Sequence, residues 1–128
     1  MTVKLFDFDR DFKILNEWLY IRKNNVVTEV PKLGYTVYIE NEPVAIGFLR
    51  MVENSYAQID SLCTNPSKLA ITRDKAIDML TEKLLETAQL LDIKAIYCFI
   101  EDKNTLMRSK KFGFTSVPQT IVVKGLNK

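Results

Sequence analysis

Histidine is absent from the 128 residues of this chain, and its absence excludes several kinds of chemistry. Without an imidazole, neither a serine–histidine–aspartate nor a cysteine–histidine catalytic group can form. A zinc site is excluded as well, because the two cysteines, Cys63 and Cys98, cannot complete a set of four ligands. Both cysteines lie in apolar runs, where a free thiol is usually a small buried side chain rather than a nucleophile. The remaining chemistry depends on carboxylates, hydroxyls, lysines, backbone amides or a bound cofactor.

Glycine, long apolar segments and net charge are also scarce. Only four glycines occur, and none lies between Phe48 and Phe112. No apolar run approaches the roughly 20 residues that cross a bilayer, and the first residues lack the pattern of a signal peptide, so we expect a cytoplasmic protein. The formal net charge is only +2, with basic and acidic residues interspersed, which argues against nucleic acid as a partner. The length fits a single domain, residues 1–128, acting as a monomer or a homodimer.

Hydrophobic periodicity predicts the order of the secondary-structure elements. In the first half we expect a strand over 3–8, a helix over 10–23 capped by Asp9, and three strands of an antiparallel meander over 35–40, 44–52 and 56–64. The apolar positions of that first helix form one buried stripe, made of Phe12, Leu15, Trp18, Leu19 and Ile21. In the second half we expect a long helix capped by Thr72, a strand over 95–100 covered on both faces, a helix over 103–111, and closing strands over 114–117 and 120–123.

This order predicts a mixed, mainly antiparallel α/β sheet flanked by helices, β-α-β-β-β-α-β-α-β along the chain. The long helix lies between strands 56–64 and 95–100 and is therefore a crossover. Because crossovers join parallel strands, these two strands should be parallel neighbours.

Three segments of the second half carry a resemblance to a known family. An apolar strand runs from Ile59 to the stop at Asn65-Pro66, Arg73-Asp74-Lys75-Ala76 opens the long helix, and Lys110-Lys111-Phe112-Gly113-Phe114 ends the last one. With the element order, these segments resemble the GNAT superfamily of acetyl-CoA-dependent N-acetyltransferases. The Asn-Pro and the Arg-x-x-Ala pattern are most similar to small GNAT-like proteins often encoded by bacteriophages.

The resemblance implies acetyl-CoA as the cofactor and two groups of residues that bind it. The cofactor phosphates would lie against Thr72, Arg73, Lys75 and Ala76 at the start of the long helix, where backbone N–H groups favour anions. The pantetheine arm would pair with the edge of the core strand at Leu62, Cys63 and Thr64. The chain departs from the family pattern here, because glycine is missing from the loop and Asp78 would repel phosphate if it faced the ligand. Thr72 and Arg73 could instead be a helix cap and a surface charge.

The resemblance also directs attention to three candidate catalytic residues. Asp60 lies on the core strand, where the family often places a general base, but a structural hydrogen bond explains a carboxylate there equally well. The family's acidic tyrosine falls at Ser109, for which an exposed helix serine is the alternative. Tyr97 could replace that phenol, or it is a buried core tyrosine.

Two functions therefore remain open. The first is transfer of an acetyl group to an unidentified primary amine. The second is a catalytically degenerate GNAT-fold protein that binds CoA or a protein partner. A basic set on the last helix would serve such a partner, or it is a solvated surface: Lys103, Arg108, Lys110 and Lys111.

Overall fold

The computed structural model describes residues 1–53 and 55–126. The chain divides into two compact units, Met1–Cys98 and Phe99–Lys128, and each is described by itself. No helix within the described ranges is long and apolar enough to cross a membrane.

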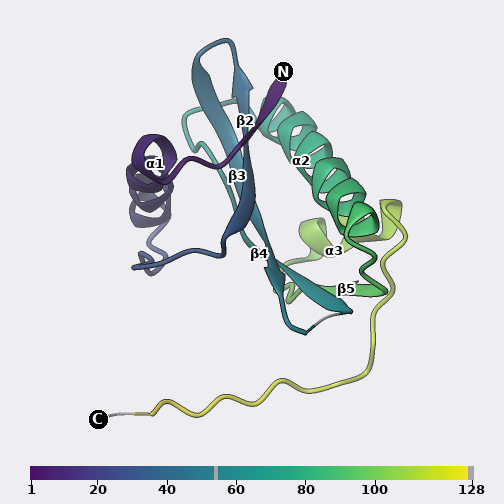
Figure 1. Ribbon diagram of the computed structural model, residues 1–128. Helices are drawn as coiled ribbons and strands as arrows, with labels where there is room; N and C mark the ends of the chain where they lie inside the picture. The colour runs from purple at the N-terminus through teal and green to yellow at the C-terminus, as the bar shows by residue number, and fades with distance from the viewer. Residues whose placement is uncertain (54, 127–128) are drawn as a thin grey trace. The chain divides into compact units, whose positions relative to one another are not determined.

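A five-stranded sheet forms the centre of the first unit (Figure 1). Its strands lie side by side in chain order, and their bounds are β1 Thr2–Leu5, β2 Leu33–Ile39, β3 Glu42–Met51, β4 Tyr56–Thr64 and β5 Ala95–Tyr97. The first four strands are antiparallel neighbours, whereas β5 pairs with β4 in parallel. The predicted meander and the predicted parallel crossover pair are both confirmed, and so is the mixed, mainly antiparallel α/β fold class.

Two helices cover the two faces of this sheet (Figure 1). Helix α1, Phe8–Ile21, packs Leu15 and Trp18 into a core cluster with Ile46, Phe48 and Cys63. Helix α2, Ala70–Leu90, lies on the opposite face and buries a stripe of small and apolar side chains that includes Ala76, Leu80 and Leu84. Helix α3, Lys103–Lys111, belongs to the second unit and lies where the sequence predicted it.

The helix starts differ from the prediction in two places. Helix α1 is capped by Asp7 rather than Asp9, because the Asp7 carboxylate accepts hydrogen bonds from the backbone N–H groups of Asp9 and Arg10. Helix α2 begins at Ala70, so Thr72 lies inside its first turn and caps nothing. Both helices start slightly earlier than the apolar periodicity indicated, since their first residues are exposed and carry no periodic signal.

The C-terminal part of the prediction is wrong in three respects. Strand β5 ends at Tyr97 instead of reaching residue 100, and Ala95 and Tyr97 are exposed rather than covered on both faces. The segments 114–117 and 120–123 form no strand within the described residues. Val122 and Val123 have exposed fractions of 88% and 89%, so their β-forming composition is not accompanied by burial. A strand requires a neighbouring backbone for its hydrogen bonds, and a local pattern cannot supply one.

A buried carboxylate that no sequence pattern predicted joins α1 to β2. Asp11 is completely buried and accepts hydrogen bonds from the hydroxyls of Tyr38 at 2.5 Å and Thr36 at 2.9 Å. The Arg10 guanidinium donates to both Asp11 oxygens at 2.8 and 2.9 Å, and the Asp7 N–H donates at 3.1 Å. Burial by itself raises the pKa of Asp11, but these donors outweigh it and hold that pKa below its ordinary value. The predicted buried stripe of α1 is therefore wrong at Ile21, which is 60% exposed, whereas Asp11 is buried.

Candidate functional site

The edge of β4 that faces β5 is paired along only part of its length. Three residue pairs join the strands, Tyr56–Ala95, Ala57–Ile96 and Gln58–Tyr97, and all lie at the start of β4. Strand β4 continues to Thr64, so its segment 59–64 has no partner strand on this edge within the first unit. Figure 1 shows the short β5 beside the first part of β4 only. The free N–H and C=O groups of such an edge bind extended ligands as an added strand would.

A β-bulge interrupts β4 in the middle of this open segment. Ile46 is opposite Cys63 and Phe48 is opposite Asp60, so Ser61 and Leu62 together face the single residue Gly47. Ser61 adopts a left-handed backbone conformation with φ of 55°. The bulge directs Leu62 over Gly47, where an added Cβ would lie 2.4 Å from Leu62 Cδ2. Bulges of this kind redirect backbone and side chains next to binding sites. The sequence carried one indirect signal of it, the glycine on the facing strand.

Asp60 lies immediately before the bulge and forms an ion pair with Arg50 of β3. Both Nε and a terminal nitrogen of Arg50 donate to Asp60 Oδ2, at 2.9 and 2.6 Å. The Ser61 hydroxyl donates to Oδ1 at 3.2 Å. Arg50 is opposite Gln58, two residues from Asp60, so the two side chains form a diagonal cross-strand pair. The candidate base is thus a half-buried carboxylate oriented by Arg50, a partner that no sequence pattern predicted.

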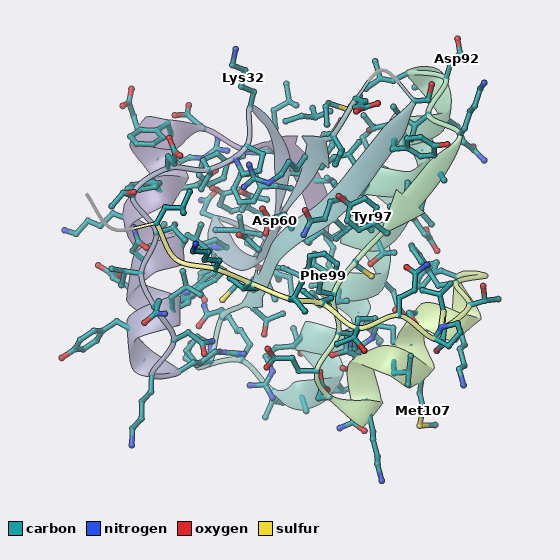
Figure 2. The ribbon with its side chains drawn as sticks, turned by 90° about the horizontal axis from the view of Figure 1, so that it is seen from below. Lys32, Asp60, Asp92, Tyr97, Phe99 and Met107 are labelled. Atoms are coloured by element: carbon teal, nitrogen blue, oxygen red, sulfur yellow. The ribbon has the colours of Figure 1, made fainter. Side chains whose placement is uncertain are left out.

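The other two candidate catalytic residues lie in different units. Tyr97 of β5 is opposite Gln58, which places it on the strand next to Asp60, and Figure 2 labels both. Its side chain is 38% exposed, so the alternative of a buried core tyrosine is wrong. Ser109 belongs to α3 in the second unit, where its hydroxyl donates to the Leu106 carbonyl at 2.6 Å. That bond is an ordinary one within a helix.

The N-terminus of α2 has no side-chain cap. Leu69 occupies the cap position and forms no side-chain hydrogen bond to the helix, and the first turn holds no acidic residue. The first backbone hydrogen bond of the helix joins the Arg73 N–H to the Leu69 carbonyl at 3.0 Å. The N–H groups of Ala70, Ile71 and Thr72 therefore have no acceptor within the helix, and such groups attract anions.

Because α2 begins at Ala70, its expected anion-binding end lies a few residues earlier in the chain than the sequence predicted. Thr72 and Arg73 are half-buried and Lys75 is exposed, whereas Ala76 is completely buried and its side chain cannot face a ligand. Asp78 lies eight residues after Ala70, about 12 Å along the helix axis from the uncapped N–H groups. At that distance its charge opposes phosphate binding less than the sequence suggested.

The two cysteines behave as small structural side chains. Cys63 is buried in the cluster with Trp18, and burial raises the pKa of its thiol although the charge of Arg22 opposes this effect. Cys98 is half-buried and burial raises its pKa too. A raised pKa keeps a thiol protonated and unreactive, which supports the structural interpretation of both.

The fold matches solved structures of acetyltransferases. A candidate acetyltransferase from Agrobacterium tumefaciens superimposes with a TM-score of 0.78 at 13% identity, covering 98% of this chain and 100% of that chain. Rv2747 from Mycobacterium tuberculosis, solved in complex with CoA and NLQ, gives 0.73 at 15% identity, with 96% and 76% covered. A candidate acetyltransferase of the GNAT family from Xanthomonas campestris gives 0.68 at 14% identity, with 98% and 94% covered. No protein-family model matches the sequence, and no curated protein matches it.

These similarities establish the fold class. The chain has the fold of the GNAT acetyltransferases, as the resemblance in its sequence predicted. At such low identities the likeness extends to the fold alone, so the reaction has to be argued from the site.

Proposed function

We propose that this protein is a CoA-dependent acyltransferase, and specifically an acetyl-CoA-dependent N-acetyltransferase that acts on a primary amine. The observation that carries the proposal is the open edge of β4, residues 59–64, with the uncapped start of α2 a few residues further on. An extended arm with amide groups fits the first, and phosphates fit the second. The CoA complex of Rv2747, which has a similar fold, supports this choice of ligand.

Each part of the site has a distinct role in this proposal. The N–H groups of Ala70 to Thr72, with the nearby charges of Arg73 and Lys75, would hold phosphates. The backbone of Leu62, Cys63 and Thr64 would hold the pantetheine arm, so that their side-chain identities matter little. Bound acetyl-CoA supplies an activated acetyl thioester.

Asp60 would accept the proton of the acceptor ammonium, directly or through a water molecule. Arg50 holds one Asp60 oxygen at 2.6 Å, and Ser61 donates to the other, so the carboxylate is oriented rather than mobile. Tyr97, on the adjacent strand, is the phenol that would protonate the leaving thiolate. Holding the amine against the thioester would contribute much of the acceleration, since proximity alone can supply a large part of it.

A second function, cofactor or partner binding without catalysis, is favoured by one observation. The residue at the family's tyrosine position is Ser109, whose hydroxyl is already bonded to the Leu106 carbonyl. The cytoplasmic location, the similarity to bacteriophage proteins and the monomeric or homodimeric state stay predictions of the sequence.

Thermal unfolding with and without acetyl-CoA tests the proposal, with free CoA and ATP as comparison ligands. Ligand at about 100 times its Kd stabilises the folded state by about 2.7 kcal/mol, which raises Tm by about 8–15 °C for a domain of this size. A rise with acetyl-CoA and CoA but not with ATP supports the proposal, and no rise at millimolar ligand contradicts it. The variant Arg73→Glu should lose the rise while keeping the Tm of the free protein, because Arg73 forms no salt bridge within the described residues.

Release of free thiol from acetyl-CoA in the presence of simple amines then separates the two functions. Amine-dependent release identifies a transferase. Binding without release, over a wide range of amines, indicates the degenerate form.

A further inference from the structure

Arg22, at the end of α1, reaches the end of β4. A terminal nitrogen of its guanidinium donates to the Thr64 hydroxyl at 2.9 Å, joining residues 42 positions apart. Trp18 and Arg22 are four residues apart and therefore lie on the same face of α1. Trp18 packs in the core cluster with Cys63, so the next turn of the helix brings Arg22 to the following residue of β4. The packing of α1 thus dictates the placement of this cation.

Hydrogen bonds at the end of α1 hold the backbone of Arg22 in place. The Arg22 N–H donates to the Trp18 carbonyl at 3.1 Å, and Lys23 closes the helix with a left-handed φ of 59°. A few residues later, the Asn16 side chain holds Val27 through two hydrogen bonds of 2.8 and 3.0 Å. The segment after the helix is therefore held on α1 at both ends.

The charge of Arg22 is not neutralised by an ion pair within the described part of the chain. A guanidinium has five N–H donors in a planar fork that fits phosphate and carboxylate, and Thr64 occupies one of them. Arg22 is exposed, so its remaining donors face solvent or a ligand. An oriented guanidinium with free donors has the features of an anion-binding residue.

Arg22 stands at one end of the open edge of β4, and Asp60 stands nearer the other. After Thr64 the chain turns at once, because the Lys68 N–H donates to the Asn65 carbonyl at 3.2 Å and Asn65 Oδ1 accepts from the N–H and hydroxyl of Ser67. Helix α2 begins two residues after this turn, at Ala70. Arg22 thus contacts the last residue of β4, and the uncapped N–H groups of α2 begin six residues further along the chain.

We propose that Arg22, oriented by Thr64, binds phosphate oxygens of the CoA-type cofactor. This inference rests on the proposed function and adds to it a residue from α1, which the sequence did not identify. It also explains how phosphates are held in a chain with no glycine between Phe48 and Phe112. A side-chain guanidinium provides the charge and the donors that close approach to a glycine loop would otherwise provide.

The test is isothermal titration of the full chain with acetyl-CoA, for wild type, Arg22→Gln and the control Lys23→Gln. Arg22→Gln should raise Kd about tenfold or more at low salt, since hydrogen bonds to charged groups are among the stronger ones. Lys23→Gln removes the same charge from the next residue and should change Kd less than twofold. The ratio of the Kd of Arg22→Gln to that of wild type should fall as salt rises from 50 to 500 mM, because salt screens a charge–phosphate interaction.

A second variant separates a loss of phosphate binding from a loss of folding. Thr64→Val keeps the shape of a buried residue and removes only the hydroxyl that orients Arg22. It should raise Kd by a smaller factor than Arg22→Gln, and all three variants should unfold within a few degrees of wild type.

The possible results separate this inference from the proposed function. If wild type binds acetyl-CoA and Arg22→Gln binds it equally well, Arg22 is no phosphate ligand and the proposed function stands. A loss of affinity that salt does not change, or one matched by Lys23→Gln, also overturns the inference. If wild type does not bind acetyl-CoA at all, both proposals are wrong.

Discussion

Replacing Asp11 by asparagine should destabilise the first unit strongly. The carboxylate is completely buried and accepts five hydrogen bonds, from Asp7, Arg10, Thr36 and Tyr38. The asparagine side chain has the same size, but its NH2 group cannot accept the hydrogen bonds that one carboxylate oxygen accepts. It also removes the negative charge that pairs with Arg10. Breaking a buried ion pair costs about 3–5 kcal/mol, and each buried donor left without an acceptor costs about 1–3 kcal/mol. Because the Arg10 side chain is 39% exposed and can return to water, we expect a loss of about 2–4 kcal/mol.

Urea unfolding at pH 7 measures this loss directly, with Asp9→Asn as the control. Asp9 lies in the same first turn of α1 but is exposed and does not cap the helix, so its replacement should cost less than about 1 kcal/mol, from the helix dipole alone. Domains of this kind have unfolding free energies of about 5–15 kcal/mol, so the Asp11 effect is large enough to resolve. A loss below about 1 kcal/mol for Asp11→Asn would refute the argument that this network stabilises the fold.

The pH dependence provides an independent check. The pKa of Asp11 is lowered in the folded state, so its stabilising contribution is present above the unfolded value near 4 and disappears as the pH falls through the folded value. The difference in unfolding free energy between wild type and Asp11→Asn should therefore be constant at neutral pH and shrink below about pH 4. A difference that grows in acid would contradict the assigned direction.

Three further outcomes follow from the structure. Gly34→Ala should cost about 1–3 kcal/mol in urea unfolding, because the new Cβ would lie 2.3 Å from the buried Phe48 ring, whereas the control Gly125→Ala meets nothing within 4 Å and should be neutral. Burial and the hydrogen bond to Asp11 raise the pKa of Tyr38 to about 12, so wild type should lose stability between pH 10 and 12, and Tyr38→Phe should lose less of it over that range. Asp60→Asn should reduce thiol release at least tenfold while shifting Tm by no more than a few degrees, because its ion pair with Arg50 is partly exposed; an unchanged rate would exclude Asp60 as the base.

The strands and helices of the first unit were predictable because their signals are local. Alternation with a period of two over 35–40 predicts β2, and turn residues on either side of 44–52 predict β3. The spacing of Ile77, Leu80 and Leu84 predicts α2. The parallel pairing of β4 and β5 followed from the helix between them. The candidate positions on β4 came from the resemblance to the GNAT family, which assigns roles to the core strand.

The contacts that give the candidate site its character were decided by the tertiary structure. Arg22 meets Thr64 across 42 residues, Asp11 meets Tyr38 across 27, and the bulge at Ser61 exists only in the register of β4 against β3. One failed prediction has the same cause, because the apolar segment 120–123 looks like a strand but pairs with no strand among the described residues. The early start of α2 has a local cause, since its first residues carry no periodic signal.

The sequence alone therefore determined the order of elements from β1 to α3, the fold class and the strand that carries the candidate site. It did so because periodicity and turn residues act over a few positions of the chain. The open edge of β4, the Arg50–Asp60 ion pair and the Arg22–Thr64 hydrogen bond were decided only when helices and strands packed together. Such features depend on distances between residues far apart in sequence, and those distances are set by packing rather than by local preference.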